Sequence, residues 1–215
     1  ALQRDRKIEV ALRSTVANMV AEETGNIFWM TDGSLFANED KFRKTMALVD
    51  KELKSSKEDF IKHFKNKYSN DYPPAWMLVE ILPLGIVTRI YDNLADNALR
   101  KKIAARFLLP VPVFSSWITI ITLVRNTCCH HSRVWNKENA ITPMLLKKTP
   151  YRWISKQISP NRTFYDVCIL KWFIDIISPE NDMKGHLKNL LSDFPHVDIA
   201  AMGFPKNWEE EPLWK

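Results

Sequence analysis

Apolar residues recur at helical spacing along nearly the whole chain. Ile8, Leu12, Val16 and Val20 form one stripe, which predicts a helix over residues 4–23 that ends near Gly25. Similar stripes, bounded by caps, glycines and prolines, predict the other helices. In chain order, the other predicted helices are residues 39–54, a stretch between Ser56 and the turn at 70–74, and residues 75–95, 97–106, 113–136, 163–177 and 182–192. A kink is expected at Pro83, within the helix over residues 75–95. The pattern therefore predicts an all-α fold.

Two stretches lack this spacing. Residues 140–162 contain Pro143, Pro150 and Pro160, and are predicted to form a loop. The last residues, MGFPKNWEEEPLWK, combine two Trp with two Pro, so we expect them to dock through aromatic contacts. We therefore expect one helical domain over residues 1–195, followed by a docked tail over residues 196–215.

The composition narrows the class of protein. The 215 residues are 46% hydrophobic and 26% charged, which is typical of globular proteins. Only 5 are Gly, and no Gly-rich phosphate-binding loop occurs. Cys128, Cys129 and Cys168 suggest no disulfide framework, and the charged N-terminus resembles no signal peptide. We therefore expect a cytoplasmic protein.

One stretch has nearly the length and apolarity of a membrane span. Residues 107–124 carry no charge, which places them at the lower limit of a spanning helix. Pro110 and Pro112 interrupt the run and leave about 12 residues before Arg125. That length is typical of a buried core helix, so no membrane partner is expected.

The predicted helix over residues 113–136 has two different faces. At 100° per residue, His131 falls on an apolar arc near Val124 and Trp135, whereas His130 falls on the opposite, polar arc. This assignment holds only if the helix continues past residue 130. The polar arc collects Ser115, Thr119, Thr122, Arg125, Asn126, His130, Arg133 and Asn136.

Arg125, Asn126 and His130 offer the groups needed to cleave RNA without a metal ion. An imidazole transfers protons near neutral pH, a guanidinium neutralises phosphoryl charge, and an amide orients both. In this reaction the 2′-hydroxyl attacks the adjacent phosphate and leaves a 2′,3′-cyclic phosphate and a 5′-hydroxyl. One helix supplies a single Arg and a single His, so two chains across a two-fold axis would complete the site. We therefore expect a homodimer.

Two other interpretations of this segment stay open. The first is an ordinary polar helix end in which His130 is only hydrogen-bonded. The second is a zinc site, because Cys128-Cys129-His130-His131 holds four potential ligands. Adjacent helical residues point in different directions, whereas zinc ligands converge from spaced positions. We therefore expect neither a metal nor another cofactor.

Positive charge concentrates around this segment. The formal net charge is +6, but residues 89–162 alone hold 13 Lys and Arg against three acids. This excess predicts a surface for RNA phosphates, on which Tyr151, Trp153 and Phe164 could stack bases. A solvated basic loop is the alternative. The candidate RNA contacts are Arg133, Asn136, Lys137, Lys147, Lys148 and Arg152.

Several blocks of the sequence resemble one known family. Arg125-Asn126-x-x-x-His130-His131-Ser132-Arg133-x-Trp135-Asn136 is similar to the motif of the bacterial Abi-like (abortive infection, AbiD/AbiF) phage-resistance proteins. Residues 5–14, 60–68, 74–85 and 202–214 resemble further family blocks, in family order. Family members usually carry more sequence before the first block, so we expect that an N-terminal part is missing here.

The resemblance implies a HEPN domain, whose pattern is Arg-x₄₋₆-His with a polar residue after the Arg. It implies a HEPN-like helical bundle with extra peripheral helices and an extended Trp-rich C-terminal tail. It also implies a toxin-type endoribonuclease that acts in phage defence as a dimer. Arg125 and His130 then form the catalytic pair. The implied supporting residues are Asn126, Arg133, Glu80 and, as a reserve that fits Arg-x₅-His, His131.

Two functions other than RNA cleavage fit the same residues. The chain could be a non-catalytic HEPN module that binds RNA or a protein partner. It could also be an interaction protein that blocks a phage component through an exposed patch around Trp208 and Trp214. The residues identify neither the RNA nor a trigger or antitoxin.

Overall fold

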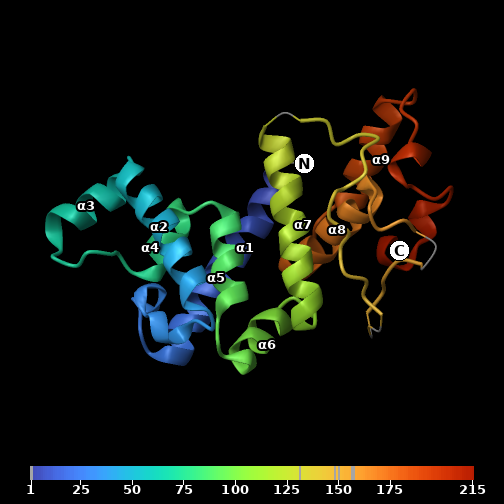
Figure 1. The fold of residues 1–215 in the computed structure, drawn as a ribbon. Coiled ribbons are helices and arrows are strands. Elements are labelled where there is room, and N and C mark those ends of the chain that lie inside the picture. Colours follow the sequence, from blue (N-terminus) through green and yellow to red (C-terminus); the bar gives the residue numbers. More distant parts are fainter. Residues whose placement is uncertain (1, 131, 148, 150, 156–157) are drawn as a thin grey trace. The chain divides into compact units, whose positions relative to one another are not determined.

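The computed structural model is helical, as the hydrophobic spacing predicts. It describes residues 2–130, 132–147, 149, 151–155 and 158–215, with side chains from residue 6 onward. Within these ranges no β-strand forms, which confirms the all-α fold class. The helices are α1 (Leu2–Thr24), α2 (Glu39–Ser55), α3 (Asp59–Lys67), α4 (Ala75–Ile81), α5 (Leu84–Asn93), α6 (Asn97–Ala105), α7 (Val111–Cys129), α8 (Thr163–Ile177) and α9 (Met183–Asp193) (Figure 1).

The chain divides into two compact units. One comprises residues 9–111, with α2 to α6 and most of α1. The other comprises residues 1–8 and 112–215, with nearly all of α7, α8, α9 and the C-terminal tail. The expected domain over residues 1–195 and docked tail over residues 196–215 stay predictions.

In the 9–111 unit, Arg13 fixes the end of α4 and Gly25 ends α1. Arg13 is buried, and its guanidinium donates to the carbonyls of Val79 and Leu82 at the end of α4. It also pairs with Glu9 one turn away, so the buried charge is balanced. Gly25, at a φ of +64°, ends α1 in the left-handed conformation that favours glycine.

The predicted helix over residues 75–95 is two helices. Pro83 has no N–H to continue the hydrogen-bond pattern, and its ring disfavours a helical conformation for Leu82 before it. α4 therefore closes with the Leu82 N–H on the Leu78 carbonyl at 3.2 Å, and α5 begins at Leu84. The proline breaks the helix where a kink was expected.

In the unit that holds residues 112–215, α7 and α8 contact each other through aromatic side chains. The rings of Phe114 and Phe173 lie 6.1 Å apart, and Trp117 meets Trp172 edge-on at 5.9 Å. The predicted loop returns along α7, where the Trp117 indole donates to the Met144 carbonyl at 3.0 Å. The apolar run of α7 thus lies in a protein core. Within the described residues, no helix combines the length and apolarity needed to cross a membrane.

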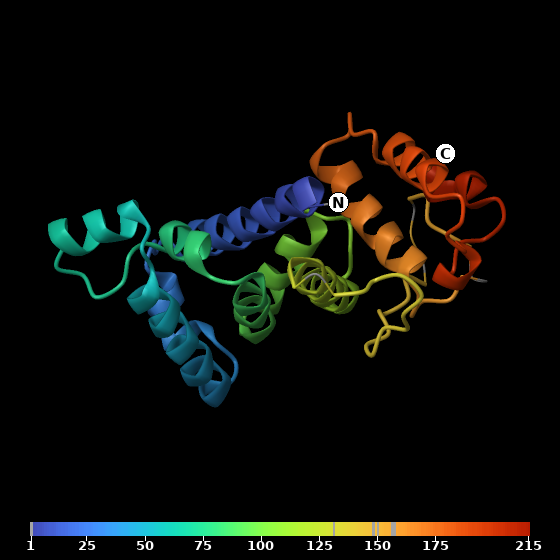
Figure 2. The same cartoon turned by 90° about the horizontal axis from the view of Figure 1, so that it is seen from above.

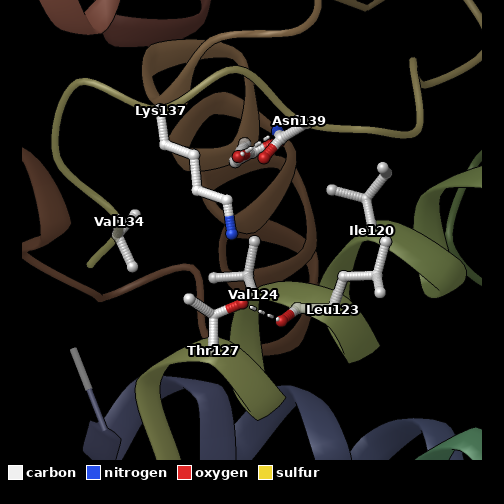
Figure 3. A pocket seen from close by; sticks show the side chains of 8 residues that line it. Ile120, Leu123, Val124, Thr127, Val134, Lys137 and Asn139 are labelled. Atoms are coloured by element: carbon white, nitrogen blue, oxygen red, sulfur yellow. Dashed lines mark hydrogen bonds between the residues drawn. The ribbon is translucent and has the colours of Figure 1, made fainter. Parts of the chain in front are cut away.

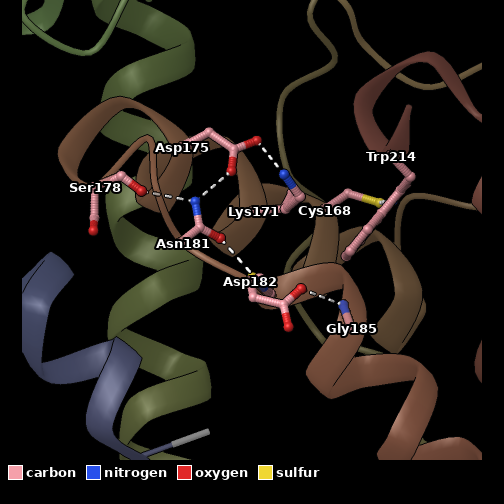
Figure 4. Close-up of polar contacts among 9 residues, drawn as sticks. Cys168, Lys171, Asp175, Ser178, Asn181, Asp182, Gly185 and Trp214 are labelled. Atoms are coloured by element: carbon pink, nitrogen blue, oxygen red, sulfur yellow. Dashed lines mark hydrogen bonds and ion pairs between the residues drawn. The ribbon is translucent and has the colours of Figure 1, made fainter.

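The C-terminal tail folds against α8 (Figure 2). Trp214 is only 1% exposed and Trp208 only 5% exposed. The Trp214 ring stacks on Phe164 at 6.2 Å, and its indole N–H donates to the Cys168 Sγ at 3.3 Å (Figure 4). Burial raises the pKa of the Cys168 thiol. Because both tryptophans are buried, the exposed aromatic patch required of an interaction protein does not form around them.

A network of side chains fixes the connection between α8 and α9 (Figure 4). Lys171 pairs with Asp175, whose other oxygen accepts from the Asn181 amide at 2.8 Å. Asp182 caps α9 by accepting from the Gly185 N–H at 2.9 Å. This turn is therefore held by polar contacts rather than by apolar packing.

Candidate functional site

The helix that carries the Arg-x₄-His motif ends earlier than predicted. α7 stops at Cys129, so the expected helix over residues 113–136 is wrong at its C-terminal end. The His130 N–H still donates to the Asn126 carbonyl at 3.0 Å, and the Ser132 N–H donates to the Thr127 carbonyl at 2.9 Å. The second bond is the six-to-one closure common at helix ends. Arg133 and Asn136 therefore lie on irregular chain, and His131 lies outside the described residues.

Asn126 connects the two residues of the predicted catalytic pair. Its side-chain Oδ1 accepts a hydrogen bond from the Arg125 guanidinium at 3.2 Å. Its backbone carbonyl accepts the N–H of His130. Arg125 is half-buried, while Asn126 and His130 are exposed. One residue thus bonds to both the guanidinium and the backbone that carries the imidazole.

The threonine hydroxyls of the predicted polar arc serve the helix itself. Thr119 donates to the Ser115 carbonyl at 2.9 Å, and Thr122 donates to the Ile118 carbonyl at 2.8 Å. Thr127 makes the same bond one turn back along α7, at 2.8 Å. These hydroxyl protons are therefore engaged by backbone carbonyls of α7 itself.

Residues after the motif are tied to the start of α8. The Thr163 hydroxyl donates to the Val134 carbonyl at 3.0 Å, and Arg162 pairs with Glu138 at 2.7 Å. The Asn139 amide donates to the Asp166 carboxylate at 2.7 Å. The chain that leaves His130 is thus held by bonds to α8 and to the residue just before it. None of these bonds was predicted from the sequence.

Asp166, in the first turn of α8, is a buried carboxylate. It is 3% exposed, and burial raises its pKa to about 6, against the opposing effect of the Asn139 hydrogen bond. Its Oδ1 has no hydrogen-bond partner among the described residues. A signal for it existed in the sequence, because it is the only acid in the mainly apolar run of residues 163–174.

A small cavity of about 30 Å³ lies between α7, α8 and the segment after the motif. Figure 3 shows the Lys137 side chain reaching across it toward Val124 on α7, while Asn139 lies at its other side. Lys137 was predicted to contact RNA, and its ammonium is directed into this cavity. The complete lining is Ile120, Leu123, Val124, Thr127, Val134, Lys137, Asn139 and Asp166.

The other predicted RNA contacts that the structure describes are accessible. Arg133, Asn136, Lys147 and Arg152 are exposed, and none of the three cations among them forms an ion pair with another described residue. Lys148 lies outside the described residues.

The aromatic residues predicted to stack on bases also differ. Phe164 is fully buried, so the prediction that it stacks on bases is wrong. The Trp153 ring lies 4.7 Å from the ring of Trp117 and belongs to the aromatic cluster of α7 and α8. Tyr151 is exposed and stays a candidate for a base.

Glu80, the remaining predicted supporting residue, is an exposed residue of α4 in the 9–111 unit. Its contribution to the Arg125–His130 pair stays a prediction. Among the described residues, no three His, Cys, Asp or Glu side chains gather as metal ligands. The four-residue set considered for zinc includes His131, which lies outside those residues.

A model of a known protein family matches the chain. The model of the family described as Abi-like protein matches residues 2–136, which includes the motif at the end of α7. No curated protein and no solved structure matches the chain.

Proposed function

The chain belongs to the Abi-like protein family, which links it to abortive-infection defence against phage, and from this premise we propose that it is a metal-independent, HEPN-type endoribonuclease. The observation that carries the proposal is the arrangement at the end of α7. There Asn126 hydrogen-bonds both to the Arg125 guanidinium and to the backbone of His130. Asn126 thus orients the phosphate-binding guanidinium, and the backbone bond keeps the residue that carries the imidazole within one turn of it.

The proposed reaction breaks one phosphodiester bond and forms one cyclic ester. The His130 imidazole takes the proton of the RNA 2′-hydroxyl, and the 2′-oxygen attacks the adjacent phosphorus. The P–O5′ bond breaks, and a second imidazole donates a proton to the leaving 5′-oxygen. Arg125 stabilises the charge that develops on the phosphoryl oxygens. The products are a 2′,3′-cyclic phosphate and a 5′-hydroxyl.

The second imidazole comes from a second copy of the chain. A single chain offers one His130, whereas acid and base act on opposite sides of the phosphorus. A homodimer with a two-fold axis through the site supplies both imidazoles and both guanidinium groups. Arg133, Lys147 and Arg152 then provide cations for neighbouring phosphates, which suits a substrate bound mainly through its backbone.

The decisive test is RNA cleavage by single variants in the presence of a metal chelator. We expect Arg125→Ala and His130→Ala each to lower the cleavage rate by about 100-fold or more, because each removes a group acting in the transition state. His63→Ala is the matched control, since it removes an exposed imidazole from α3. The products of the unaltered protein should end in 2′,3′-cyclic phosphate.

Two results would oppose the proposal. Cleavage that survives both substitutions would place the chemistry elsewhere. RNA that stays intact at high protein concentration, yet binds, would favour the non-catalytic RNA-binding module.

A further inference from the structure

A cationic cavity lies between α2 and α5, within the 9–111 unit. It has a volume of about 320 Å³. Its lining consists of Lys41, Lys44, Thr45, Arg89, Asp92 and Asn93. We propose that this cavity binds the phosphate of a nucleotide, either free or within an RNA chain.

Hydrogen bonds fix the walls of the cavity. Asn93 is 5% exposed, and its amide bonds twice to the Asn38 backbone, accepting from the N–H at 3.1 Å and donating to the carbonyl at 2.9 Å. The Ala37 N–H donates to the Asn93 carbonyl at 2.8 Å. Asn38 in turn caps α2 by accepting from the Lys41 N–H at 2.8 Å. The start of α2 is therefore tied to the end of α5, and the cavity is formed before any ligand binds.

The charges around the cavity do not balance. Lys41, Lys44 and Arg89 are exposed, and none of them forms an ion pair with a described residue. The lining contains one carboxylate, Asp92, which lies 3.9 Å from the Arg100 guanidinium. Three cations thus line a cavity whose single acid, Asp92, already lies close to Arg100. A phosphate group supplies the missing negative charge and accepts hydrogen bonds from all three.

A neighbouring arginine on α2, unlike the cations of the cavity, has its charge balanced by acids. Arg43, on another face of α2, pairs with Asp40 and lies 3.8 Å from Glu39. The helix therefore carries enough acids to balance a cation, and these acids lie away from the cavity. Lys41, Lys44 and Arg89 thus line the cavity without a paired acid, whereas Arg43 has acids of its own.

Apolar side chains lie beside the cavity and favour a nucleotide over an inorganic anion. A smaller hollow of about 10 Å³ shares Thr45, Arg89 and Asn93 with the cavity and is otherwise lined by apolar side chains. Two of these, Phe36 and Phe42, stack on each other at 4.8 Å. The cations would bind the phosphate, and the base would lie against the part-exposed Phe36 and Phe42 beside them.

The cavity and the proposed ribonuclease site share no residue. A free nucleotide in the cavity would be a ligand independent of RNA cleavage. A phosphate within RNA would make the cavity a second binding point for the substrate and would then rest on the proposed function. The binding test below needs no cleavage, so either proposal can fail alone.

The test is binding to the full chain, measured by calorimetry with AMP and by fluorescence anisotropy with a labelled 2′-O-methyl RNA decamer that resists cleavage. We expect Lys41→Ala/Arg89→Ala to weaken at least one probe by about tenfold or more, since the variant removes two phosphate-binding cations. Lys51→Ala/Lys54→Ala is the matched control, because it removes the same charge from α2 outside the cavity. It should change binding by about twofold or less.

The affinities of the variants for the two probes distinguish a free nucleotide from a phosphate within RNA. A specific decrease in affinity for AMP identifies a free nucleotide, and a specific decrease for the decamer alone identifies an RNA phosphate. Lys44→Glu should weaken the same probe as strongly, and unchanged melting temperatures show that the variants fold. Absence of binding by both probes, or equal decreases in the cavity and control variants, overturns the proposal.

Discussion

The Asn139 amide donates a hydrogen bond to the Asp166 carboxylate at 2.7 Å, and so joins the chain that follows His130 to the buried face of α8. Together with the Thr163–Val134 bond, it anchors the segment that carries Arg133 and Lys137. The position of the candidate site thus depends on a buried acid outside the Arg-x₄-His motif.

Asp166 should make the free energy of unfolding depend on pH. Its pKa in the folded protein, about 6, exceeds the ordinary 3.8, so the folded state binds the proton more tightly. The resulting stability is full below pH 4 and is lost as the pH rises through about 6. We expect the unaltered protein to lose about 3 kcal/mol across this window relative to Asp166→Asn, which keeps an oxygen for Asn139. Urea unfolding at pH 4 and pH 7 measures this difference. Equal pH dependence in both proteins would contradict it.

Asn126 should act by orienting Arg125. Asn126→Ala removes the acceptor for the guanidinium but keeps the backbone bond to His130. We therefore expect the cleavage rate to fall by about tenfold, less than for removal of the catalytic groups themselves. Asn126→Asp retains the acceptor and should restore most of the rate. If both variants lose activity equally, the side chain acts otherwise than by accepting from Arg125.

A shared site in a homodimer should give a distinctive mixing curve. Arg125→Ala/His130→Ala chains mixed in equal amount with unaltered chains, and allowed to exchange, leave about one quarter of the dimers with two intact subunits. Activity per total chain should fall to about that quarter. A fall to only about half would mean that each subunit acts alone, and light scattering on the unaltered protein provides the mass of the assembly.

The exposed cations after the motif should contribute separately to RNA affinity. We expect Arg133→Ala or Arg152→Ala to weaken binding and to reduce the dependence of log K on log salt by about 0.7 for each phosphate that is no longer neutralised. Arg162→Ala is the control, because its guanidinium is already paired with Glu138 at 2.7 Å. Salt titrations with the uncleavable decamer measure the slopes. Equal slopes in all three variants would remove these residues from the RNA surface.

Trp214 should be important for stability. Its ring is 1% exposed, so Trp214→Ala is expected to lower the free energy of unfolding by about 3–5 kcal/mol. Trp76→Ala is the comparison, since that ring is 46% exposed and should cost about 1 kcal/mol or less. Chemical denaturation followed by circular dichroism measures both. A neutral Trp214→Ala would mean that the tail does not stabilise α8.

The helical spacing predicted the fold class because the apolar periodicity of each helix is local information. It did not predict where α7 ends, since neither Gly nor Pro occurs between Arg125 and Ile141 to mark an end. The helix closes through the Ser132–Thr127 bond while Val134 and Asn139 bond to α8. Those partners are distant in sequence, so the apolar periodicity of a helix cannot predict them.

The contrast between local patterns and contacts distant in sequence also explains which site residues were predicted. Arg125, Asn126 and His130 were identified because their types and spacing are themselves the signal. Asp166 was not, because an acid in a mainly apolar helix gains its meaning only from burial and from the Asn139 hydrogen bond. The cavity around Arg89 was missed because its cations come from two helices, and Lys44 and Arg89 lie more than forty positions apart in the sequence.

The hydrogen bond between Asn139 and Asp166 also bears on the order of folding. It closes a loop of 27 residues, for which the cost in chain entropy is about 3 kcal/mol before any strain is counted. One hydrogen bond contributes about 1 kcal/mol, so this loop cannot close on its own. The segment after His130 therefore takes its position only once the aromatic side chains of α7 and α8 have met. Local opening of that helix pair would disable the site while the individual helices remain formed.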